Sequence, residues 1–95
     1  MPYVVYLLLC KDKTIYTGIT TDVRRRFVEH KAGKASHYTS ARGAEKILYT
    51  EKHRSRGAAL KREAQIKGWT RKKKLALVTI KPVLSGIEGK LTLKK

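Results

Sequence analysis

Two basic side chains in one predicted helix point toward the fold rather than toward water. Residues 23–31 predict a helix, and at about 100° per residue Arg26 and His30 flank the apolar Val23 and Phe27. Burying a charge costs free energy unless something compensates it. A guanidinium that binds an anion and an imidazole that moves a proton would explain this placement. The alternative is that Arg26 lays its stem along the core edge while His30 bonds a backbone carbonyl.

A carboxylate occupies the inward face of a second predicted helix. Glu63 falls between the edges of the apolar arc, which Ala59 and Leu60 mark, in a chain that has only 7 acidic residues. One interpretation is an i,i+4 ion pair with Lys67, which lies on the same arc. The other is a site for one divalent cation, because a hard carboxylate oxygen together with retained waters suits Mg²⁺. The pattern alone leaves both open.

Three strands are predicted to position these helices. Residues 3–9 are apolar on both parities, which predicts a central strand covered on both faces. Residues 14–19 predict a second strand, and the short connection between the two favours an antiparallel hairpin. Residues 46–52 predict a third strand, with Ile47 and Tyr49 on one face.

The expected fold is α+β, a small three-stranded antiparallel sheet flanked by three helices. Each helix has a predicted N-cap: Thr21 or Asp22 for 23–31, Ser55 for the helix that ends near Gly68, and Thr70 for 71–79. Residues 32–44 predict a polar loop that is long enough to be functional. Residues 1–79 form the predicted domain, and 80–95 a loosely held basic tail.

Charge points to a polyanionic partner. The 95 residues carry 23 Lys and Arg against 7 Asp and Glu, for a net charge of +16, which favours nucleic acid first and an anionic membrane surface second. The length excludes a multidomain enzyme, and the single cysteine excludes an internal disulfide. The apolar start is too short to span a bilayer and lacks signal-peptide features, so we expect a cytoplasmic protein that does not associate with a membrane.

Basic side chains spread along the chain are candidates for contacts with backbone phosphates. They are Lys34, Arg42, Arg54, Arg56, Arg71, Lys72, Lys73 and Lys74, and Tyr38 is expected to line the cleft. No predicted helix carries spare polar side chains of the kind that read base edges in a groove. Recognition of nucleic-acid structure is therefore expected, rather than recognition of a base sequence.

The ordered motifs of the chain resemble those of the GIY-YIG nuclease superfamily. The resemblance rests on Val4-Val5-Tyr6, Tyr16-Thr17-Gly18, Arg26 before an aromatic residue, His30, and Glu63 within residues 58–63. Residues 15–20, with Tyr38-Thr39 and Leu48-Tyr49, are more similar still to its small, single-domain YhbQ-like bacterial branch. Val4 stands where the name motif begins with glycine, and Thr17 replaces its middle isoleucine.

The resemblance implies an endonuclease that hydrolyses phosphodiester bonds in DNA with Mg²⁺ or Mn²⁺, acting on branched or damaged structure. It assigns a role to each of five residues: Tyr6 as general base, Tyr16 as its partner, Arg26 on the phosphate oxygens, His30 as proton relay or water positioner, and Glu63 as metal ligand. Arg26 and a bound metal are expected to shift the Tyr6 pKa downward, toward the phenolate.

Two functions remain open on these residues. The first is the nuclease, with DNA favoured over RNA and no obligate protein partner. The second is a non-catalytic or weakly catalytic nucleic-acid-binding module on the same fold. Basic composition fits both, whereas a pure binder needs neither Tyr6 in that place nor the inward carboxylate of Glu63 in a cationic groove.

Overall fold

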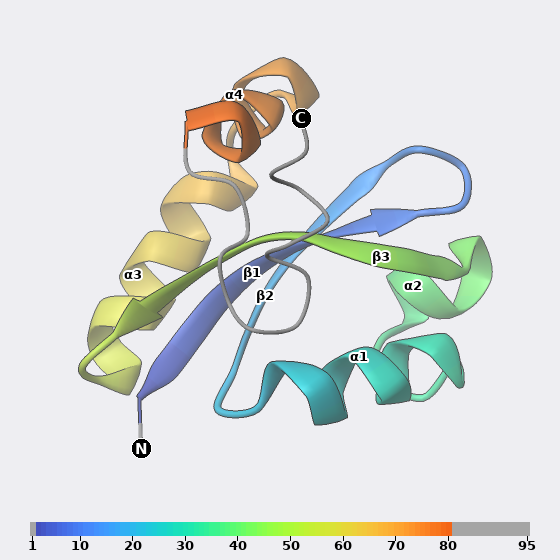
Figure 1. Ribbon diagram of the computed structural model, residues 1–95, viewed down its shortest axis with the longest axis horizontal. Coiled ribbons are helices and arrows are strands. Elements are labelled where there is room, and N and C mark those ends of the chain that lie inside the picture. Colours follow the sequence, from blue (N-terminus) through green and yellow to red (C-terminus); the bar gives the residue numbers. More distant parts are fainter. Residues whose placement is uncertain (1, 81–95) are drawn as a thin grey trace.

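A three-stranded antiparallel sheet forms the centre of the molecule (Figure 1). The computed structural model describes residues 2–80. The strands are β1 (Tyr3–Cys10), β2 (Ile15–Thr20) and β3 (Ala44–His53), in the order β2-β1-β3. The most apolar strand is therefore central and buried on both faces, as its composition predicts.

Four helices cover the two faces of this sheet. They are α1 (Val23–Lys31), α2 (His37–Arg42), α3 (Arg56–Lys67) and α4 (Arg71–Ile80). The side chains of α1 pack on the face that carries Tyr6 and Leu8, while α3 and α4 pack on the face that carries Val5 and Leu7. The α+β fold with a three-stranded antiparallel sheet is confirmed.

Helix α2 is the fourth helix, and it occupies the segment that was predicted to be a loop. The Ser36 side chain caps it by accepting a hydrogen bond from the Thr39 N–H at 3.1 Å. Gly43 ends it with φ of 80°, a conformation that glycine adopts without strain. Six mostly polar residues have too little apolar periodicity to predict a helix. The expected basic tail lies outside the described residues from position 81 onward.

A β-bulge in β3 overturns one prediction about the sheet. Leu7 pairs with Tyr49, but Leu8 pairs with Ile47, so that Leu48 is an extra residue in the ladder. Ile47 therefore packs with α1 and Tyr49 with α3, on opposite faces, and the prediction of a shared face is wrong.

None of the helices in residues 2–80 is long and apolar enough to cross a membrane.

Candidate active site

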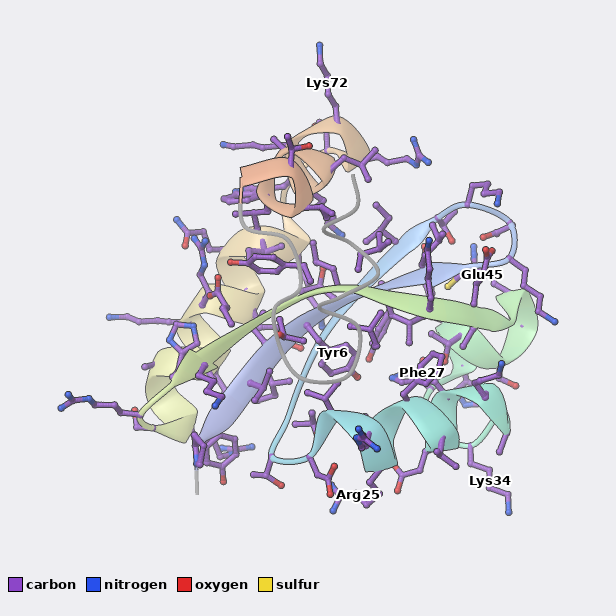
Figure 2. The ribbon with its side chains drawn as sticks, viewed as in Figure 1. Tyr6, Arg25, Phe27, Lys34, Glu45 and Lys72 are labelled. Carbon is purple, nitrogen blue, oxygen red and sulfur yellow. The ribbon has the colours of Figure 1, made fainter. Side chains whose placement is uncertain are left out.

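Tyr6, His30 and Thr39 form a buried hydrogen-bonded chain beneath α1. The Tyr6 hydroxyl lies 2.7 Å from His30 Nε2, and His30 Nδ1 lies 2.7 Å from the Thr39 hydroxyl. All three residues are at most 1% exposed. Figure 2 shows Tyr6 between the sheet and α1. The alternative in which His30 bonds a backbone carbonyl is therefore wrong, because both of its ring nitrogens face hydroxyl groups.

The donors and acceptors of this chain can be assigned from its geometry. A neutral imidazole donates from one nitrogen and accepts at the other. The Thr39 hydroxyl lies 3.4 Å from the Ser36 carbonyl and 3.1 Å from the Ser36 hydroxyl, so it can donate to Ser36 and accept from Nδ1–H. Nε2 then accepts from the Tyr6 hydroxyl, whose hydrogen would otherwise be buried without an acceptor. His30 is held as the tautomer that can take the Tyr6 proton.

Burial shifts the pKa values of both groups toward their neutral forms. It raises the pKa of Tyr6 from 10.0 to about 12, and the opposing effect of the Arg26 guanidinium is smaller. The expected downward shift of the Tyr6 pKa is therefore wrong for the protein alone. Burial, aided by the charge of Arg26, lowers the pKa of His30 from 6.5 to about 4. The imidazole is neutral at physiological pH.

The low pKa of His30 predicts a loss of stability in acid. The unfolded chain binds a proton at His30 below about pH 6.5, while the folded chain resists it down to about pH 4. The free energy of unfolding should fall as pH is lowered through this window. Urea titrations of the wild type and of His30→Gln measure it, and the variant should show a weaker pH dependence there. Equal slopes would mean that His30 titrates normally in the folded protein.

Arg26 reaches the same site from the first turn of α1. Its guanidinium NH1 bonds Glu29 Oε1 at 2.9 Å and NH2 bonds the Ala35 carbonyl at 3.4 Å. Its buried Nε has no partner within the described part of the chain. The neighbouring Arg25 is exposed and points away from the sheet in Figure 2. The helical geometry thus separates the two arginines as predicted.

Aromatic packing brings both tyrosines of the motifs to His30. The Tyr16 ring centroid lies 5.2 Å from that of His30, 6.2 Å from that of Tyr6 and 5.7 Å from that of Tyr38. Gly18 lies beneath Tyr6, where a Cβ atom would come within 2.6 Å of the hydroxyl oxygen. A side chain at position 18 would therefore displace the very group that bonds His30.

Glu63 lies on the buried face of α3, with its side chain 17% exposed and 3.4 Å from Lys67. The predicted i,i+4 ion pair is present. No cluster of three or more His, Cys, Asp or Glu side chains exists among residues 2–80, so a metal at Glu63 would have fewer than three such ligands from that part of the chain. A single, partly exposed hard oxygen donor fits Mg²⁺ or Mn²⁺, which keep several waters and take phosphate oxygens as further ligands.

A second polar network, which the sequence did not reveal, fixes α3 on the sheet. Glu51 Oε2 on β3 accepts hydrogen bonds from Arg62 Nε at 2.8 Å and lies 2.7 Å from His53 Nε2. The hydroxyl of Tyr49 donates to Glu51 Oε1 at 2.5 Å. Arg62 directly precedes Glu63, so this network sets the position of the candidate metal ligand. The sequence also did not predict Thr39 as a partner of His30, because only its position next to Tyr38 in the motif distinguished it.

The predicted phosphate-binding cations do not gather in one patch. Lys34 and Lys72 lie at opposite ends of the molecule (Figure 2). Arg42 pairs with Asp12 at 3.1 Å and covers the Tyr38 ring, and Arg71 donates to the Lys13 carbonyl at 2.9 Å. Three of the remaining cations are exposed, namely Arg54, Arg56 and Lys73. Lys74 is buried. The positive charge thus surrounds the domain and does not outline a single groove.

Comparisons with known proteins identify the family of the chain. Residues 2–76 match the GIY-YIG catalytic domain. A UPF0213 protein of Natronomonas pharaonis is 47% identical over 74 residues, covering 78% of this chain and 87% of the relative. A UPF0213 protein of Streptococcus agalactiae serotype V is 45% identical over 78 residues, covering 82% and 89%. The solution NMR structure of a UPF0213 protein from Bacillus halodurans has a TM-score of 0.59 at 38% identity, covering 100% of this chain and 99% of that one. The chain therefore belongs to the GIY-YIG catalytic-domain family and is similar to the UPF0213 proteins.

Proposed function

We propose that this protein is a metal-dependent nuclease that hydrolyses phosphodiester bonds in DNA. The observation that carries the proposal is the 2.7 Å hydrogen bond between the buried Tyr6 hydroxyl and His30 Nε2, next to the Arg26 guanidinium. A phenol joined to a neutral imidazole can pass its proton on while it takes one from water. Membership of the GIY-YIG family supports the same chemistry.

The proton path avoids a free phenolate, but its final acceptor is His30, whose pKa of about 4 makes it a weak base until the negative charge of a bound phosphate raises that pKa. A phenol with a pKa of about 12 is almost never ionised at neutral pH, so it is a poor base by itself. In the proposed step the phenol hydrogen moves to His30 Nε2 as the phenol oxygen takes a proton from the attacking water. The water oxygen forms the new bond to phosphorus, and the bond to the leaving oxygen breaks. Thr39 holds His30 in the tautomer that this step requires.

Arg26 would bind the non-bridging oxygens of the phosphate. A planar guanidinium offers paired donors and cannot lose its proton, so it suits the charge that develops in the transition state. Its NH1 is held by Glu29 and its Nε has no partner in residues 2–80. The side chain is thus oriented, and each terminal nitrogen keeps a second hydrogen that could meet a phosphate, whereas Nε is buried.

Glu63 would hold Mg²⁺ or Mn²⁺ in exchange for its ion pair with Lys67. When bound, the metal polarises the phosphate and stabilises the departing alkoxide. The Glu51–Arg62 network holds α3 on the sheet, and the charge of Glu63 contributes to the raised pKa of Tyr6, so the two side chains lie within electrostatic reach of each other. Lys67 is released to contact the nucleic acid.

A cleavage assay tests this proposal directly. Purified full-length protein is mixed with labelled single-stranded, duplex, flap and junction DNA, and with an RNA of the same sequence, in Mg²⁺, Mn²⁺ or EDTA. We expect cleavage of DNA with either metal and none in EDTA. Tight binding of every substrate without any cleavage would favour a binding module instead.

The metal role of Glu63 has its own expected result within that assay. Glu63→Gln should raise the Mg²⁺ concentration for half-maximal cleavage at least about tenfold, because it removes a charged ligand. Binding of DNA in EDTA should stay equal or become tighter, since a negative charge facing phosphate is lost. The same metal dependence in variant and wild type would leave only the ion pair with Lys67 as the role of Glu63.

A further inference from the structure

A cavity of about 410 Å³ opens beside the edge strand β2, next to the candidate active site. Its lining comes from β2, α2, the last residue of α3, and α4. The lining residues are Ile15, Tyr16, Thr17, Tyr38, Lys67 and Lys74. Tyr16 is shared with the site, since its ring also packs on His30. Apart from Lys67, which would leave Glu63 when the metal binds, the rest of this lining has no part in the proposed chemistry.

The ammonium of Lys74 lies in this cavity without a counter-ion. Lys74 is only 9% exposed, and its Nζ donates to the Ile15 carbonyl at 3.3 Å. No carboxylate among the described residues pairs with it, and burial together with the charge of Lys67 lowers its pKa. A buried ammonium of this kind costs stability unless an anion joins it. The position of Lys74 therefore favours an anionic ligand in this cavity.

Thr17 supplies a second unused polar group in the same cavity. The residue is 2% exposed, and its hydroxyl has no hydrogen-bond partner in the part of the chain that the structure describes. Buried side-chain hydroxyls are nearly always bonded in native proteins. Two ammonium groups line this space, Lys67 with Glu63 as its partner and Lys74 with only the Ile15 carbonyl, and the Thr17 hydroxyl is buried beside them. Donors of this kind suit a phosphate group.

Two of the residues that line this cavity are aromatic. The Tyr16 and Tyr38 rings lie 5.7 Å apart, and Tyr38 is 37% exposed. Sugars and bases of single strands pack on such rings. A cavity of this volume accepts a ligand of about one nucleotide, and not the two strands of a duplex.

We propose that this cavity binds one unpaired nucleotide of the substrate strand, with its phosphate on Lys74, Lys67 and Thr17 and its sugar and base against Tyr16 and Tyr38. The nucleotide lies next to the cleaved bond, because Tyr16 borders both places. This inference rests on the proposed function and names its substrate: DNA with a single-stranded segment beside the cleavage point. Lys67 connects the two sites, since it also pairs with Glu63.

Binding without cleavage tests the cavity independently of the nuclease. Fluorescence anisotropy in EDTA compares the wild type with Lys74→Met and with Lys61→Met, which removes the same charge from an exposed position on α3. We expect Lys74→Met to weaken binding of a single-stranded or flap oligonucleotide by about tenfold or more, because charged hydrogen bonds are lost. Lys61→Met should weaken it by less than about threefold.

A second measurement identifies the phosphate itself. One neutral methylphosphonate is placed in turn at each position of the strand. The wild type should lose affinity at one flanking position, and Lys74→Met should lose nothing further at that position. Thr17→Val, which keeps the shape of the side chain, should show a smaller loss at the same position. Thermal melting should show Lys74→Met at or above the wild-type melting temperature, since a buried unpaired charge is removed.

The outcomes separate this inference from the proposed function. Equal binding by Lys74→Met and Lys61→Met, or no sensitive phosphate, overturns the cavity as a binding site even if the protein cleaves DNA. A selective loss with Lys74→Met supports the cavity, and it does so in EDTA whether or not cleavage is later seen with metal. Equal affinity for duplex and flap DNA in the wild type would contradict the unpaired strand.

Discussion

Arg26→Ala is expected to lower the single-turnover rate of DNA cleavage by a factor of about 10² or more, since preorganised donors of this kind contribute several kcal/mol to transition-state stabilisation. The guanidinium is anchored by Glu29 and the Ala35 carbonyl, close to the Tyr6 hydroxyl. No other arginine of residues 2–80 shares that position. Measurement at saturating protein separates chemistry from affinity.

Arg25→Ala is the matched control for this prediction. Arg25 lies on the same turn of α1, but its side chain is 56% exposed and makes only a 3.7 Å ion pair with Glu29. Its loss should reduce binding slightly and leave the single-turnover rate within about threefold of the wild type. Equal rate losses in both variants would mean that the arginine run acts only as a positive patch, and the binding-module alternative would then be preferred.

The parts of the fold that follow from local patterns could be predicted from the sequence. The apolar residues of β1 occur on both parities and the strand is central, as expected. Capping residues Asp22 and Ser55 begin α1 and α3 as predicted. Helical periodicity placed Arg26 and His30 toward the sheet, because a regular helix fixes the direction of each side chain.

The predictions that were wrong concern features that depend on long-range packing. The bulge at Leu48 reverses the alternation of β3, and no local signal in that stretch predicts an extra residue in the ladder. The pKa of Tyr6 depends on how deeply it is buried, which composition does not reveal. A high net charge suggested an easily ionised phenol, but loss of hydration outweighs the nearby Arg26.

The sequence motifs predicted four of the side chains that the structure gathers at the candidate site, but not the residues that hold them in place. Tyr6, Tyr16, Arg26 and His30 came from ordered motifs, and the structure brings them within one cluster. Thr39 and Glu51 act through a partner that is distant in sequence, so neither had a recognisable spacing. The Thr39 hydroxyl is nine residues from His30 along the chain, across the turn from α1 into α2.

Tyr6→Phe is the second large expected effect, because it removes the oxygen that is proposed to activate water. General base catalysis contributes about 10² to 10⁴ in rate, and the variant should lose that much in single-turnover cleavage. The change also leaves His30 Nε2 without its partner, which should lower the free energy of unfolding by about 1–3 kcal/mol. Gly18 remains in contact with an aromatic ring, so the packing of the strand is preserved.

The role of the Tyr6 hydroxyl in activating water is therefore tested by the single-turnover rate of Tyr6→Phe on flap DNA in Mg²⁺. The rate is measured at saturating protein, at a temperature where circular dichroism shows that the variant is folded. We expect DNA binding close to that of the wild type in EDTA and a cleavage rate lower by at least about 10². A cleavage rate within a few fold of the wild type would contradict this expectation, because the Tyr6 hydroxyl would then have no part in the reaction.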